Sequence, residues 1–202
     1  AGTYFKLAIN RPGVTFNSNA ANTVTNDLNV AGGTYALGAN NLTVGLAANT
    51  NSGSIVVASG QSISQTAGTT TIATSAVGTA TISGGIAGGT VTFFNLSFDK
   101  STTVSTAATY VLGSTAGQTI RADGTLTVAT GAGTGTATTT ASANNPTLDV
   151  NTDVIINASG TLAAPGSSAF TVAGSWANSA TFTHSSGTVT FDSTATGKTI
   201  AA

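Results

Sequence analysis

One run of the sequence carries the oxygen ligands that a calcium loop needs. Asp149, Asn151 and Asp153 place carboxylate or amide oxygens at alternate positions, as calcium-binding loops do. The sixth position of such a loop is normally glycine, but here it is Val154, and no acidic residue closes the loop. On a β-strand the same three residues would simply point outward. The sequence therefore predicts a solvated strand face, with a calcium site as the alternative.

The single histidine, His184, is the only imidazole available as a general base. It follows a Thr-Phe-Thr strand pattern and precedes the turn sequence Ser185-Ser186-Gly187. No serine stands in the Gly-x-Ser-x-Gly pattern of a nucleophile elbow, and the chain has no Cys and no Glu. We therefore expect no catalytic residue, no cofactor and no enzymatic activity. A polysaccharide lyase is the enzyme alternative, although it would need clustered acids and bases.

Trp176 is the only tryptophan and stands between Ser175 and Ala177. An exposed indole ring among small residues could stack on a sugar, so Trp176 is a candidate for ligand stacking. The alternative is a position in the core or at the edge of a coil.

Threonine pairs of the form Thr-x-Thr recur and could form a flat array of the kind found on ice-binding proteins. They stand at Thr23/Thr25, Thr79/Thr81, Thr90/Thr92, Thr125/Thr127, Thr181/Thr183 and Thr188/Thr190. Their starts are separated by 56, 11, 35, 56 and 7 residues. Ice binding needs the pairs to stack at one fixed coil spacing, so this irregular spacing argues against it.

The composition excludes several classes of protein. Only 5% of the 202 residues are charged, with five basic and six acidic side chains, which leaves no basic surface for nucleic acid. The absence of Cys excludes disulfides and zinc–thiolate sites. No window holds the roughly 18 unbroken apolar residues of a membrane span. A chain with so little charge and nothing easily oxidised suits a location outside the cell.

Short runs of alternating apolar and small polar residues predict β-strands. They cover 41–44, 90–93, 125–128, 170–172, 181–183 and 188–191. The alternation places Val, Leu and Phe on one face and Thr on the other. Gly and Asn between these runs favour tight turns. The expected fold class is therefore all-β.

Internal repeats indicate one periodic structure. Residues 3–11 match residues 92–100 at an offset of 89, and Thr-Val-Thr-Phe occurs at both 90–93 and 188–191. We therefore treat 1–202 as a single elongated β-repeat domain. Residues 131–145, rich in Thr and Ala without a large apolar side chain, are expected to form an irregular segment.

The two ends of the chain look like neighbouring parts of this pattern. Thr199-Ile200-Ala201-Ala202 followed by Ala1-Gly2-Thr3-Tyr4-Phe5 is close to the internal sequence that leads into Phe93-Phe94. The chain is then either one unit of a covalent tandem array, or its end stacks on the start of the next copy. These nine terminal residues are the predicted self-assembly interface. With no initiator Met, we expect a processed form or a piece of something longer.

Residues 187–191, then Thr199-Ile200, then residues 3–7 resemble the strand repeats of large bacterial surface proteins, and residues 170–184 do as well. These are the adhesin-like and autotransporter-passenger-like β-solenoids. The resemblance covers 1–45, 90–130 and 165–200. It implies an extracellular, elongated and non-enzymatic scaffold.

The expected fold is thus a parallel β-solenoid (a β-helix) of about eight to ten coils, each of about 20–25 residues. The alternative is an antiparallel β-sandwich of the pilin or immunoglobulin-like kind, linked to its neighbours by residues 4–10 as a donated strand. The expected function is that of a repeat unit in a surface filament, fibre or adhesin stalk that propagates head to tail. Its main partner is then itself, with no nucleic acid and no membrane insertion. The alternative function is a binding module for surface glycans, another carbohydrate or ice.

Overall fold

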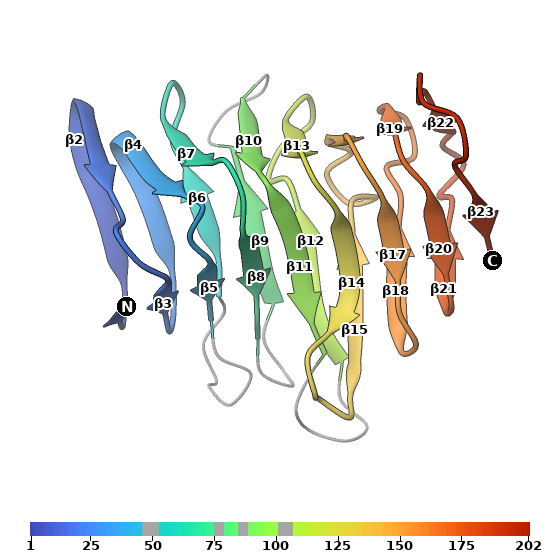
Figure 1. Cartoon of the computed structure of the whole chain (residues 1–202), viewed down its shortest axis with the longest axis horizontal. Helices are drawn as coiled ribbons and strands as arrows, with labels where there is room; N and C mark the ends of the chain where they lie inside the picture. The colour runs from blue at the N-terminus through green and yellow to red at the C-terminus, as the bar shows by residue number, and fades with distance from the viewer. Residues whose placement is uncertain (46–52, 75–78, 85–88, 101–106) are drawn as a thin grey trace.

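The protein is an elongated stack of β-strands. The computed structural model describes residues 1–45, 53–74, 79–84, 89–100 and 107–202. Throughout these ranges the regular elements are strands and none is a helix, so no described helix could cross a membrane. Figure 1 shows the strands side by side along the long axis, from β2 near the N-terminus to β22 and β23 near the C-terminus.

The stack contains three sheets, two of which run its whole length, whereas the third begins at β10. In spatial order, the first sheet comprises β1 (Gly2–Tyr4), β3 (Asn22–Val24), β5 (Leu42–Val44), β8 (Thr69–Ile72), β11 (Asn95–Asp99), β14 (Leu126–Thr130), β17 (Val154–Ile156), β20 (Trp176–Asn178) and β23 (Ile200–Ala201). The second sheet comprises β2 (Leu7–Asn17), β4 (Leu28–Gly38), β6 (Ile55–Val57), β9 (Thr79–Ser83), β12 (Ala107–Leu112), β15 (Thr136–Thr140), β18 (Gly160–Ala163) and β21 (Thr181–Thr183), with β7 (Ser62–Gln65) paired to β4 beside this path. The third sheet comprises β10 (Thr90–Phe93), β13 (Thr119–Ala122), β16 (Thr147–Val150), β19 (Phe170–Val172) and β22 (Val189–Phe191).

The chain visits the three sheets in turn and then returns to the first one. Each strand pairs in parallel with the strand from the next turn, for example β14 with β17 and β13 with β16. This confirms the parallel β-solenoid. The antiparallel sandwich alternative is wrong, because every described pairing is parallel. Residues 4–10, which that alternative used as a donated strand, belong to the molecule's own β1 and β2.

The first sheet has nine strands, so the chain completes eight turns, here called rungs, between its first and last strand. This number lies within the expected eight to ten coils. At about 4.8 Å per rung the rod is about 40 Å long. The rungs differ in length: register partners are 20 residues apart at Asn22 and Leu42 but 30 apart at Leu96 and Leu126. Corners between strands absorb these differences. Two long strands, β2 and β4, bend so that each forms two sides of its rung. The first half of β4 pairs with β6 and its second half pairs with β7.

The interior is a column of mostly apolar side chains, among which a few polar residues such as Thr70, Gln118 and Thr139 are also buried. Along the first sheet, one inward position is occupied from rung to rung by Val24, Val44, Ile72, Phe98, Val128 and Ile156, all buried. The period-2 alternation of the sequence produces this arrangement, since every second side chain faces inward. In the middle of the rod the ring centroids of Phe98 and Tyr110 lie 5.0 Å apart, and the Tyr110 hydroxyl donates to the carbonyl of Asp99 at 2.6 Å. Burial raises the pKa of Tyr110 well above its ordinary value, and the Asp99 charge adds to this.

The strand runs expected from the sequence correspond to β5, β10, β14, β19, β21 and β22. Part of the segment 131–145 forms a strand, β15, which pairs on both sides. The two segments of the 89-residue echo lie on different sheets: residues 3–11 run from β1 into β2, whereas residues 92–100 run from β10 into β11.

Candidate functional site

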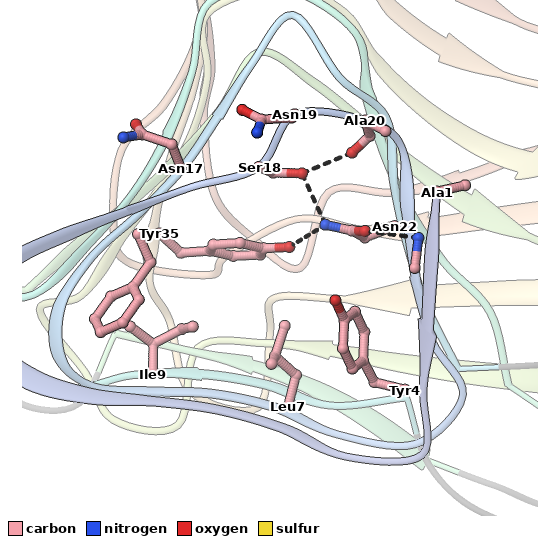
Figure 2. Close-up of a pocket in the computed structure, with 12 residues that line it drawn as sticks. Ala1, Tyr4, Leu7, Ile9, Asn17, Ser18, Asn19, Ala20, Asn22 and Tyr35 are labelled. Atoms are coloured by element: carbon pink, nitrogen blue, oxygen red, sulfur yellow. Dashed lines mark hydrogen bonds between the residues drawn. The ribbon is translucent and has the colours of Figure 1, made fainter.

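The N-terminal end of the rod is open. A cavity of about 390 Å³ lies inside the first rung, where the side chains of Tyr4, Leu7, Ile9 and Phe16 line it. Figure 2 shows Tyr4, Leu7 and Ile9 reaching into the triangular space enclosed by the chain. Tyr4 and Phe16 are 41% and 38% exposed, although their neighbours in the next rung are buried. These apolar side chains occupy inward positions with no rung above them.

A polar cluster crosses the same cavity. The Asn22 amide nitrogen donates to the Ser18 hydroxyl at 2.8 Å and to the Tyr35 hydroxyl at 2.6 Å, and its carbonyl oxygen accepts from the Gly2 N–H at 3.0 Å (Figure 2). Burial raises the pKa of Tyr35 above its ordinary value, and the hydrogen bonds of Asn22 and Ser18 oppose the shift. Asn22 therefore anchors β1 to the second rung.

The C-terminal end is open in the same way. Trp176, Phe182, Val189, Phe191 and Ile200 line an apolar groove of about 220 Å³. The ring centroid of Trp176 lies 4.8 Å from that of Phe182 and 6.1 Å from that of Phe191, and both contacts are edge-to-face. Phe191 is 41% exposed and Ile200 is 67% exposed. This end thus presents the aromatic interior of the last rung to solvent.

Trp176 itself is only 5% exposed and belongs to the core. It occupies the inward position of β20 and pairs in register with Val154. Its ring face is therefore not available to a sugar on the outer surface of the rod, although its edge reaches the groove.

The predicted self-assembly residues lie at both ends of one sheet. β1 contains Gly2–Tyr4 and is the first strand of the first sheet, whereas β23 contains Ile200–Ala201 and is its last strand. The segments 1–5 and 199–202 are therefore at opposite ends of the rod and do not meet within one molecule (Figure 1). Sequence reasoning missed Phe16, Phe182 and Phe191, which complete the two open ends. Their signal was a large apolar residue in the first or last strand-like runs.

The side chains of the calcium candidate bind different partners. Asp149 forms an ion pair with Arg121 at 3.2 Å, and Asn151 donates to Asp123 at 3.0 Å. Asp153 instead accepts the N–H of Ser175 in the next rung at 2.6 Å. Within the described part of the chain, no three His, Cys, Asp or Glu residues are close enough to hold a metal ion.

Arg121 lies between two carboxylates on the outer side of the third sheet. Its second ion pair, to Asp123, is 2.7 Å long, and this hydrogen bond is the main cause that raises the pKa of Arg121. The group is a solvated cross-rung network rather than a binding pocket.

His184 lies in the exposed turn between β21 and β22, as the sequence suggests. Its Nδ1 accepts the N–H of Ser186 at 2.9 Å, and its carbonyl accepts the N–H of Gly187 at 2.8 Å. These bonds shape the turn.

Corner side chains connect neighbouring rungs at two places along the first sheet. Asn41 accepts the N–H of Thr69 at 2.9 Å, and Asn95 accepts the N–H of Thr125 at 2.9 Å. Each bond uses a side-chain oxygen to bind the backbone at the entry to the following strand of the first sheet. The corners therefore lock neighbouring rungs without any charge pair.

The six threonine pairs lie in or beside strands of three different sheets: β3 and β14 of the first, β9 and β21 of the second, and β10 and β22 of the third. On the outer side of the second sheet, one column consists of Thr79, Thr109, Thr138, Thr161 and Thr181, without interruption. The adjacent column consists of Thr81, Val111, Thr140, Ala163 and Thr183. Rungs of unequal length therefore still align single threonines in one column, although the six pairs identified from the sequence do not form one array.

Fold and ends together define a parallel β-solenoid rod with an open apolar rung at each end. Comparison of the chain with protein-family models, with curated proteins and with solved structures finds no match.

Proposed function

We propose that this chain is a non-enzymatic structural unit of an extracellular rod, such as a surface filament, fibre or adhesin stalk, that propagates head to tail. One observation carries the proposal. Columns of apolar side chains that are buried in the inner rungs end at both termini in exposed members, Tyr4 and Phe16 at one end and Phe191 at the other. A further rung would bury them, and sheet edges with free backbone groups favour such an addition.

The construction of the rod suits a load-bearing role. Two parallel sheets pair the backbone along the full length and a third does so from β10 onward, and the corner bonds of Asn41 and Asn95 each add a side-chain tie between two rungs. Only three ion pairs occur among the described residues, so we expect salt and pH to change the stability of the fold little. Stability of this kind persists in a variable external medium.

The location is tested on intact cells that make the protein. We expect antibodies raised against the folded chain to label fibres on unpermeabilised cells in immunogold electron micrographs. An antibody against an intracellular protein serves as the control and should label only lysed cells. Label on the chain that appears only after lysis would contradict an extracellular role.

The threonine columns of the second sheet favour a second function, binding to ice. The five-threonine column repeats every rung, about 4.8 Å, and its neighbour lies two residues along the strand, about 6.7 Å away. The outward side chains of β9, β12, β15, β18 and β21 carry no charge. A regular, uncharged array of hydroxyl and methyl groups can match an ordered lattice of water.

Thermal hysteresis of a freezing solution tests this second function. We expect the native chain to show hysteresis and the double variant Thr138→Lys/Thr161→Lys to lose it, since two charges would break the central column. The matched control is Thr43→Lys, a partly exposed position on the first sheet, which should keep the effect. A native chain that shows no more hysteresis than an ordinary globular protein would remove ice binding from consideration.

A further inference from the structure

We propose that β23 is a removable cover, and that the first rung of a second copy of this chain displaces it when two molecules join end to end. This inference rests on the head-to-tail propagation proposed above and specifies how the joint forms. It follows from the polarity of the sheets, the number of strand positions at the joint and the weak attachment of β23.

The polarity of the strands permits only one kind of joint. All described strand pairs are parallel, so the last strand of each sheet offers the same edge as every inner strand. A second copy that approaches with its N-terminal rung presents β1 and the bent strand β2 with the same polarity as the last strands, so pairing stays parallel. Two C-terminal ends would have to meet with their strands antiparallel. The joint is therefore head to tail, and it does not close on itself.

The number of strand positions creates a conflict at this joint. The last complete rung consists of β20, β21 and β22, and β23 already begins another rung on the first sheet alone. If β1 of a second copy paired with β23, a gap of one rung, about 4.8 Å, would remain on the other two sheets. If the two halves of the incoming β2 instead pair with β21 and β22, β1 must pair with β20. That position is occupied by β23.

The native β23 and the incoming β1 compete for the free edge of β20, and β23 is the more weakly attached of the two. It has two residues, both exposed, and pairs with β20 at two positions. Its neighbourhood adds the bond from the Trp176 N–H to the Thr199 carbonyl, 2.8 Å, and a 3.2 Å bond from the Thr199 N–H to the Ser175 hydroxyl. β1 has three residues in register with β3, and its ends are tied by Asn22 and by the bond from the Thr25 N–H to the Tyr4 carbonyl, 2.7 Å. The exchange therefore releases β23 rather than β1.

The two surfaces that would meet have the same chemistry as the interior. The groove beneath β23 is lined mainly by Trp176, Phe182, Val189 and Phe191, and the incoming rung offers Tyr4, Leu7 and Phe16. Leu7, Phe182 and Val189 are partly buried and pack against the core. Joining the ends gives each of these side chains the second layer of apolar neighbours that inner rungs have, which is the main driving force.

Sedimentation velocity over a range of concentrations, with negative-stain electron microscopy, tests the proposal. Ala201→Pro weakens β23, because proline cannot donate to a strand ladder. We expect it to lower the concentration at which end-to-end association begins by about tenfold, the effect of roughly two weak hydrogen bonds. The same substitution at Thr194, in the exposed segment before β23, should leave this association concentration unchanged.

Phe16→Asp and Phe191→Asp should each prevent growth at one end only. Val56→Asp is the matched control, since Val56 is 40% exposed but points outward in the middle of the rod.

Mixing the two blocked variants gives the sharpest outcome. The intact C-terminal end of Phe16→Asp can accept the intact N-terminal end of Phe191→Asp, so the mixture should form 1:1 dimers and nothing longer. The double variant Ala201→Pro/Phe16→Asp should stay monomeric. Its dimerisation would mean that two grooves pair with each other and would overturn the proposal, as would an Ala201→Pro chain that associates no better than the native one. Monomeric rods of unchanged shape for every variant would also overturn the exchange, while leaving the extracellular rod to be judged by surface labelling.

Discussion

Replacement of Phe98 by alanine is expected to lower the free energy of unfolding by about 4 kcal/mol, because the change opens a cavity in the middle of the interior. Phe98 is fully buried between Ile72 and Val128 of the adjoining rungs, and its ring contacts Tyr110.

The substitution should also reduce the cooperativity of unfolding. In a solenoid each rung contacts mainly its neighbours, so a weakened central rung uncouples the two halves. Urea unfolding followed by Trp176 fluorescence reports on the C-terminal rungs, while circular dichroism reports on the whole rod. We expect the two curves to coincide for the native chain and to separate for Phe98→Ala. Phe98→Leu, which fills most of the volume, should cost about 1 kcal/mol. A loss equal to that of the leucine variant would show that the interior repacks freely.

Replacement of Gly33 by alanine is expected to cost about 3 kcal/mol. Gly33 lies where β4 bends, with a φ of 89°, in the left-handed region that disfavours other residues. A Cβ atom there would lie 2.3 Å from the carbonyl oxygen of Val14 and 2.6 Å from that of Arg11, both backbone atoms of the preceding rung. Backbone strain of about 1 kcal/mol therefore adds to a clash that only a shift of β2 can relieve.

Gly60 provides the matched control for Gly33. Its φ is 72°, and a Cβ atom there would have nothing within 4 Å. Gly60→Ala should therefore show the conformational strain alone, about 1 kcal/mol. Chemical denaturation of both variants isolates the clash as the difference between them. Equal losses would mean that adjacent rungs separate easily at the bend.

Alternation of residue types made the strands and the fold class predictable from sequence. Runs such as Thr90-Val91-Thr92-Phe93 place Val and Phe inward in any strand, and both are buried here. The number of rungs was predictable as well, because the short and long rungs average to about the usual coil length. The bends of β2 and β4 were not, since they depend on register shifts that no local pattern reveals.

The register between strands of neighbouring rungs could not be predicted from the spacing of residues in the sequence. Thr79 and Thr109 are 30 residues apart whereas Thr161 and Thr181 are 20 apart, yet both are neighbours in one column. A corner can lengthen without moving the strands on either side, so distance along the chain does not record alignment in space. The ends were predictable only in part, for the same reason: the terminal segments were identified from the sequence, but Phe16 and Phe191 became end residues only through the folding of the whole rung.

The corner bonds from Asn41 and Asn95 have a consequence for how the molecule is made. Each of these amides captures the strand that arrives 28 or 30 residues later, and nothing further along the chain is needed to complete the contact. A growing polypeptide, or one threading through a narrow pore, can therefore add one turn at a time to a finished base. The already folded part acts as a template and holds each new turn in place, so the rod can lengthen vectorially before its last residues have emerged.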